Sequence, residues 1–285
     1  MIRRQIVRAL GIAAAVLVAL PAYAQQRPLV TEDPEPVGAG RLLVEMGIDY
    51  LRDLGYPASG LRGNLISGPN IGVSIGLSSI AELQIDGGLR NRLAITHRIP
   101  NAPLSNMLTI VGNSTNSVED FVIATKVRIV AETASRPSFG VRFATRLPNA
   151  GNESGLGLDT TDFFTSMLTA KTVQSVRIVG NVGFGILGDP TRGDLQNDVL
   201  TYGISGARAV TDEIEVVGEL NGRADMREGD PPPGTESRAG LRGGIRYTKG
   251  AMRLDSAVIF GMTVRDPSIG FTFGFTYVFN AFKIP

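Results

Sequence analysis

The chain has 285 residues, of which 43% are hydrophobic and only 19% are charged, and its formal charge is +1. This near-neutral charge, with no clustered basic stripe, argues against a nucleic-acid partner. The absence of cysteine excludes disulfides, thiolate metal sites, thiol nucleophiles and the lipidated cysteine of a lipoprotein. The 35 glycines and 16 prolines favour strands and tight turns over long helices.

The first residues have the pattern of a secretory signal peptide. Arg3, Arg4 and Arg8 precede an apolar stretch over residues 9–22, which ends in the small-x-small site around Tyr23. The stretch is shorter than the ~20 residues of a spanning helix. We therefore predict a signal peptide over residues 1–24. An exported chain with no further apolar helix is either a β-rich periplasmic protein or an outer-membrane barrel.

The last segment of the chain is predicted to be a strand. Large apolar residues occupy every odd position from Ile269 to Phe279, and small or polar residues occupy most positions between them. A strand places such an alternating set on one face, whereas a helix would scatter it around the axis. Thr272, Gly274, Tyr277 and Phe279 also resemble the closing signal of barrel-assembly machinery, which is therefore an expected partner.

Similar period-two segments recur along the mature chain, separated by turn residues. They predict twelve strands near residues 41–53, 65–77, 81–89, 120–131, 138–147, 162–171, 176–187, 198–210, 214–224, 237–247, 252–263 and 269–279. From the second strand onward the connections alternate between short and mostly long ones, which is typical of an outer-membrane barrel with tight periplasmic turns. The predicted fold is all-β, a single antiparallel up-and-down transmembrane β-barrel over residues 41–279.

The charged side chains share one parity on these strands. An arginine that faces lipid costs ~2–4 kcal/mol at the bilayer midplane, so this parity is expected to face the lumen. A soluble sandwich would instead place the same charges in water and the apolar face in its core. The signal peptide, the connections and the closing strand favour the barrel. The predicted pore-lining residues are Glu45, Asp49, Glu82, Asp86, Lys126, Arg128, Arg142, Arg146, Arg177, Glu215, Glu219, Arg223, Arg238, Arg242, Arg246, Arg253 and Asp255.

Several stretches share a recognisable pattern: residues 27–34, the glycine pair around Ala39 followed by Glu45, residues 155–163, Asp189-Pro190 and Asn197-Asp198. Together they resemble the MetA-pathway phenol-degradation and transporter family of outer-membrane barrels. The resemblance spans nearly the whole mature chain. It implies an outer-membrane channel that small organic or aromatic compounds use, and it implies no catalytic residue.

Other motifs favour ordinary structural roles. Residues 183–188 match the spelling of a dinucleotide-binding loop, but Asp189-Pro190 follows in place of the required helix. His97 is the only histidine, and it has no partners at the spacing of a metal site or a hydrolase triad. We therefore expect no cofactor, no metal and no enzyme activity. An outer-membrane hydrolase of lipids or esters remains one alternative, and a non-conducting binding or structural barrel remains another.

Three features are left open by the residues. The apolar loop over residues 90–119 either folds over the mouth or lies against the outer leaflet or other loops. The inward charges either orient solutes or pair with each other across a narrow lumen. Residues 25–40 are expected to form a periplasmic segment, with a plug in the lumen as an open alternative, and residues 280–285 extend beyond the barrel. The predicted function is passive passage of small solutes through the bacterial outer membrane, with membrane lipid and the solute as partners.

Overall fold

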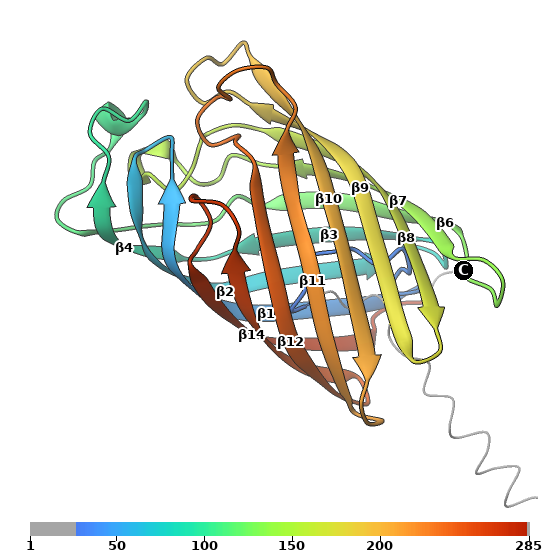
Figure 1. Cartoon of the computed structure of the whole chain (residues 1–285). Coiled ribbons are helices and arrows are strands. Elements are labelled where there is room, and N and C mark those ends of the chain that lie inside the picture. Colours follow the sequence, from blue (N-terminus) through green and yellow to red (C-terminus); the bar gives the residue numbers. More distant parts are fainter. Residues whose placement is uncertain (1–26, 284–285) are drawn as a thin grey trace, which may run out of the picture.

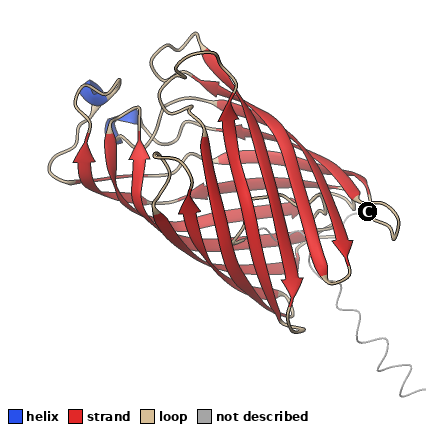
Figure 2. Ribbon diagram, viewed as in Figure 1, coloured by secondary structure: helices blue, strands red, loops and turns tan. Residues whose placement is uncertain are grey.

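The computed structural model describes residues 27–283, which form a closed antiparallel β-barrel of twelve strands (Figure 1). Closure comes from the pairing of β1 with both β2 and β14, so no strand edge is left between the first and last strands. The strands tilt strongly against the barrel axis (Figure 2). The predicted signal peptide lies outside the described residues.

The barrel strands follow one another around the wall in chain order. They are β1 (Arg41–Tyr56), β2 (Leu61–Gly76), β3 (Ala81–Gly88), β6 (Val122–Val130), β7 (Ser138–Arg146), β8 (Asp162–Val173), β9 (Val176–Gly188), β10 (Gln196–Ala209), β11 (Ile214–Asp225), β12 (Arg238–Lys249), β13 (Met252–Gly261) and β14 (Ile269–Asn280). The period-two segments of the sequence therefore correspond to the observed barrel strands.

Two additional strands extend the sheet beyond the barrel at the long-loop end. The half of β2 that precedes Pro69 pairs with β4 (Asn91–Arg98), and β4 pairs with β5 (Ser114–Ser117). These residues belong to the segment that the sequence predicted as one long loop. Leu93, Ile95 and Leu108 pack against leucines of β1 and β2 and against Leu156 of the next long loop. The apolar loop thus forms a small core at the rim of the mouth.

The two ends of the barrel differ in the length of their connections. Short turns such as residues 77–80, 174–175 and 250–251 lie at the end that also holds Arg41 and Asn280, which are paired. The longer connections lie at the opposite end, and the two short 3-10 helices of the described residues, η1 (Ser105–Met107) and η2 (Asn152–Ser154), are among them (Figure 2). The short-turn end is periplasmic in barrels of this architecture.

Residues 27–283 contain no helix of the length and apolarity needed to cross a membrane.

The outer surface of the barrel is apolar. Phe273 is 60% exposed, Ile48 57% and Met167 65%. Contact of such apolar side chains with water is unfavourable, so this surface requires an apolar environment. The charged parity of the barrel strands points inward, where Lys126 of β6 and Glu82 of β3 are fully buried. This arrangement is inverted relative to a soluble sandwich, and it places the barrel in the bacterial outer membrane.

Replacement of Phe273 by arginine is expected to lower the free energy of unfolding in lipid by about 2–4 kcal/mol, because the side chain points outward near the middle of β14. Phe279 has the same parity but lies one residue from the periplasmic end of that strand. Phe279→Arg is therefore the matched control, with an expected cost of about 0–1 kcal/mol. Urea unfolding in liposomes measures both, and equal costs would contradict a lipid-facing β14.

Candidate functional site

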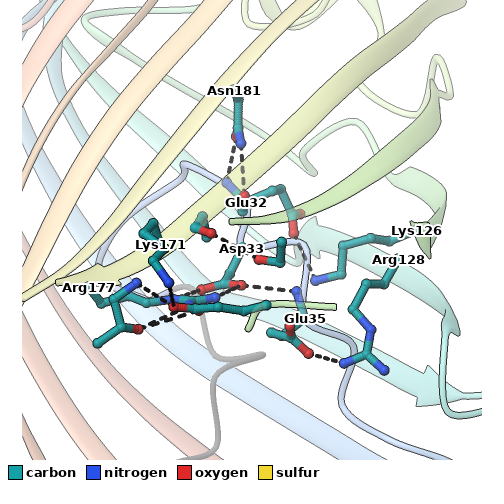
Figure 3. A network of polar contacts seen from close by, with 12 residues as sticks. Glu32, Asp33, Glu35, Lys126, Arg128, Lys171, Arg177 and Asn181 are labelled. Carbon is teal, nitrogen blue, oxygen red and sulfur yellow. Dashed lines mark hydrogen bonds and ion pairs between the residues drawn. The ribbon is translucent and has the colours of Figure 1, made fainter. Parts of the chain in front are cut away.

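The N-terminal segment lies inside the barrel. Residues 27–37, the plug segment, cross the lumen from the wall formed by β12, β14 and β1 to the wall formed by β9, β6 and β3. Figure 3 shows the contacts of Glu32, Asp33 and Glu35 with the second wall. The expectation of a periplasmic segment is therefore wrong for these residues. The reason is electrostatic, because Glu32, Asp33 and Glu35 find their cationic partners on the inner wall.

Glycines on the inner wall make room for the plug segment and its continuation. A Cβ at Gly203 would lie 2.7 Å from the Thr31 hydroxyl oxygen, and a Cβ at Gly76 would lie 1.7 Å from the Gly38 carbonyl oxygen. The second neighbour is backbone and cannot rotate away. Glycine at position 76 therefore permits the close approach of the chain as it leaves the lumen and enters β1.

Glu32 occupies the most buried part of this network. Its carboxylate lies 3.3 Å from Lys126 Nζ and 3.0 Å from Arg142 Nε, and its backbone N–H donates to Asn181 Oδ1 at 2.7 Å. Lys126 Nζ also lies 2.9 Å from a Glu82 carboxylate oxygen. These pairs exclude water from the lumen centre, and they join the plug segment to β6, β7 and β9.

The next acidic residues bind the wall toward the periplasmic end. Asp33 accepts two hydrogen bonds from Arg177, at 2.8 and 2.7 Å, in a bidentate pair. Glu35 pairs with Arg128 (Figure 3). Bidentate charge-assisted pairs are among the stronger polar contacts in proteins. The segment is therefore held at several points along its length.

The first part of the plug segment binds the opposite wall. Arg27 donates to the Thr272 hydroxyl at 2.7 Å, and its carbonyl oxygen accepts from Arg246 at 2.8 Å. The backbone N–H of Val30 donates to Glu219 at 2.8 Å. Both walls thus contact one short stretch of chain, which replaces direct pairing of the walls across the lumen.

The predicted pore-lining residues fall into two groups. Those that contact the plug segment are Asp49, Glu82, Lys126, Arg128, Arg142, Arg177, Glu219, Arg242, Arg246 and Asp255. Glu45 belongs to the same group, because it accepts a hydrogen bond from the Arg27 backbone and a second one from Thr276. Those that contact other wall or loop residues, or lie beside another strand of the inner wall, are Asp86, Arg146, Glu215, Arg223, Arg238 and Arg253. Their role in selectivity stays a prediction.

A cavity of about 410 Å³, the vestibule, opens at the long-loop end of the lumen. Its lining includes Asp49, Leu51, Leu54, Tyr56, Leu65, Asn91, Glu119, Asp120, Arg146, Leu156, Leu158, Arg223 and Arg238. Leucines of β1, β2 and the loop after β7 form one side. The arginines come from β7, β11 and β12. The cavity therefore combines an apolar wall with a charged one.

Two smaller cavities continue from the vestibule toward the plug segment. One, of about 180 Å³, shares Asp49, Leu51 and Arg238 with the vestibule. The other, of about 200 Å³, shares two residues of β11 with the first and is lined by Thr31 of the plug segment. Adjoining cavities thus extend from the long-loop end to the plug.

Glu119 lies between β5 and β6, exposed to the vestibule but enclosed by the barrel mouth. This enclosure, with the neighbouring Asp49 and Asp120, raises the pKa of its carboxyl from 4.5 to about 6. A raised pKa means that the folded state holds the proton more tightly than the unfolded state does. The contribution of Glu119 to stability is therefore present below pH 4.5 and is lost as the pH rises through 6.

Glu119→Gln is accordingly expected to raise the free energy of unfolding at pH 8 by about 1 kcal/mol, since cavity water screens part of the effect, and to change nothing at pH 4. Urea unfolding at the two pH values measures this. Glu213→Gln, at an exposed periplasmic turn, is the control. A Glu119 variant that is less stable at pH 8 would contradict the raised pKa.

The remaining sequence motifs have structural positions. His97 is exposed in β4, and its imidazole makes no hydrogen bond within residues 27–283. The glycine-rich stretch 183–188 lies in β9 and begins no helix. No group of three or more potential metal-ligating side chains occurs in the described part of the chain. The absence of enzyme activity stays a prediction.

Functional residues that the sequence prediction missed are those outside the strongest alternating segments or without a charge. Glu32, Asp33 and Glu35 lie in the segment that the sequence places in the periplasm, with a lumen plug as the open alternative. Asn91 and Glu119 lie in the segment 90–119, which the sequence predicted to be one long loop. The chain offered one signal for the first group, because the bases on β6, β7 and β9 outnumber the acids there and require acidic partners from elsewhere.

The structure resembles several outer-membrane proteins at low sequence identity. They include the porin NanC (TM-score 0.47, 10% identity, 85% of this chain and 100% of that chain), the translocator domain of the autotransporter NalP from Neisseria meningitidis (0.46, 9%, 83% and 87%) and the channel DcaP of Acinetobacter baumannii (0.42, 9%, 84% and 96%). No protein-family model and no curated protein sequence matches the chain.

Proposed function

We propose that this protein is an outer-membrane channel for small organic solutes, in which the plug segment limits passage. The observation that supports it is the series of adjoining cavities, of about 410, 180 and 200 Å³, that leads from the mouth to residues 30–32. A solid barrel interior would have no such path. The phenol-degradation resemblance of the sequence agrees with organic solutes, and assembly by the barrel-assembly machinery remains part of the proposal.

The plug segment distinguishes this channel from an open pore. Passage through the periplasmic half requires that residues 27–37 move or leave, because Lys126, Glu82 and Glu32 fill the lumen centre. The contacts are side-chain ion pairs and hydrogen bonds to a segment joined to the barrel only at β1. Displacement therefore breaks no barrel strand pairing.

Liposome swelling with the mature chain and with a variant that lacks residues 27–37 tests the proposal. The wild type is expected to admit small solutes slowly, and the deletion variant is expected to admit them many times faster. Empty liposomes and heat-denatured protein are the controls. If neither form admits solutes, the channel is wrong, and a binding or structural barrel is the better description.

A further inference from the structure

The vestibule has the features of a ligand site in addition to those of a pore mouth. Asn91 is 9% exposed and lines this cavity, and its Oδ1 accepts no hydrogen bond within the described residues. Asp49 Oδ1 and Arg146 Nε, also in the lining, make no hydrogen bond there, but they lie at ion-pair distance from Arg27, at 3.7 Å, and from Asp120, at 3.8 Å. Buried polar atoms in folded proteins nearly always have partners, so the unpaired amide oxygen of Asn91 at this cavity points to a bound molecule.

One pole of the vestibule attracts cations. Asp49, Glu119 and Asp120 all line it, and burial together with the charges of Asp49 and Asp120 raises the pKa of the Glu119 carboxyl. Asp120 also pairs with Arg146, at 3.8 Å. Asn91 adds a carbonyl oxygen to the same lining. An ammonium group would satisfy these acceptors and reduce the repulsion.

The other pole attracts anions. Arg223 donates to the carbonyl oxygens of Glu236 and Gly234 at 2.9 and 2.6 Å, and it forms no ion pair within residues 27–283. Arg238 lines the same cavity and donates to the carbonyl oxygens of Arg265 and Gly55, whereas the charge of Arg146 is already paired with Asp120 and Asp162. A carboxylate is the group that a guanidinium without an acidic partner binds best.

The rest of the lining includes an apolar surface. Leu51, Leu54 and Leu65 of β1 and β2 contribute to it together with Leu156. A volume of about 410 Å³ falls in the range of small-molecule sites. A ligand that fits therefore carries an ammonium group, a carboxylate and an apolar body.

We propose that the vestibule binds a small apolar zwitterion, a free amino acid or a short peptide, before it enters the lumen. Only the entry of the ligand into the lumen rests on the proposed channel function. Binding itself requires only the cavity and its two charged poles.

Calorimetry on the full mature protein in detergent tests the binding with L-phenylalanine and its two single-charge analogues, 3-phenylpropionate and 2-phenylethylamine. We expect L-phenylalanine to bind at least ~10-fold more tightly than either analogue, since each analogue leaves one pole unpaired. L-leucyl-L-phenylalanine, whose charges lie further apart, tells whether a peptide fits better than an amino acid. No binding of either zwitterion, or equal binding of all probes, would overturn the proposal.

Two variants assign the poles. Arg223→Gln is expected to weaken the binding of L-phenylalanine and 3-phenylpropionate about 10-fold and to leave the binding of 2-phenylethylamine unchanged. Glu119→Gln is expected to weaken the binding of L-phenylalanine and 2-phenylethylamine about 10-fold and to leave the binding of 3-phenylpropionate unchanged. Arg208→Gln and Glu213→Gln, both exposed and outside the vestibule, are the matched controls. Should a variant fail to fold, the wild-type comparison still decides. Binding without flux in liposomes would refute the proposed channel and support the binding site. Flux without binding would support the channel and refute the binding site.

Discussion

Replacement of Lys126 by methionine is expected to lower the free energy of unfolding by about 3–5 kcal/mol. The ammonium group is fully buried between Glu82, at 2.9 Å, and Glu32, at 3.3 Å. Its removal leaves a buried carboxylate of Glu82 without its cation, and the desolvation cost of that charge is no longer offset. Methionine keeps the length of the side chain, so the loss reports the charge and not a cavity.

Two further variants make this expectation specific. Lys126→Met combined with Glu82→Gln removes the uncompensated charge, and it is expected to recover at least half of the lost free energy, because Glu32 keeps Arg142 at 3.0 Å. Lys171→Met alters a lysine that pairs with Glu132 at the rim, and its expected cost is at most about 1 kcal/mol. Urea unfolding measures all three. A Lys126→Met cost equal to that of Lys171→Met would show that the central charges are solvated.

The sequence predicted the wall of the barrel because membrane strands have a strict physical signature. Outward side chains meet hydrocarbon and inward ones meet charges, so parity alone identifies segments such as residues 269–279, observed as Ile269–Asn280. The extension formed by β4 and β5 was missed, although Leu93 and Ile95 alternate with Arg92 and Ala94. Gly87 and Gly88 interrupt the alternating pattern just before β4.

The sequence left the plug segment as an open alternative for a different reason. Its residues include Pro28, Pro34 and three acids, and they have no strand or helix pattern. Their position follows from long-range charge balance and not from local propensity. Lys126, Arg142 and Arg177 are among the predicted inward charges, for which the sequence leaves two roles open, the orientation of solutes and pairing across the lumen. The structure shows a third arrangement, in which the chain supplies the counter-charge from its own N-terminal segment.

The candidate site could be predicted only in part because it depends on which loops meet at the mouth. Arg223 and Arg238 were predicted to face inward, and both contribute to the vestibule. Asn91 and Glu119 join them through the sheet extension at β4 and the short segment before β6. Nothing in the local sequence indicates that these residues converge, because their separation along the chain exceeds any motif spacing.

Neutralisation of the three acids of the plug segment, Glu32→Gln, Asp33→Asn and Glu35→Gln together, is expected to raise channel conductance by at least ~10-fold. The change removes the ion pairs to β6, β7 and β9 and leaves every barrel strand pairing in place. Each charge-assisted contact contributes about 1.5–3 kcal/mol, so the loss of three contacts shifts the equilibrium between the bound and the displaced plug segment by far more than tenfold. The conductance of the fully open barrel then limits the increase that is measured.

Planar-bilayer recording at fixed salt measures this effect. A control with the same change in net charge replaces three exposed acids outside the lumen, Asp198→Asn, Asp212→Asn and Glu213→Gln. It is expected to conduct like the wild type. If the plug variant and this control conduct equally, residues 27–37 do not limit passage. If both rise together, net charge and not release of the plug segment determines conductance, because only the first variant alters contacts inside the barrel.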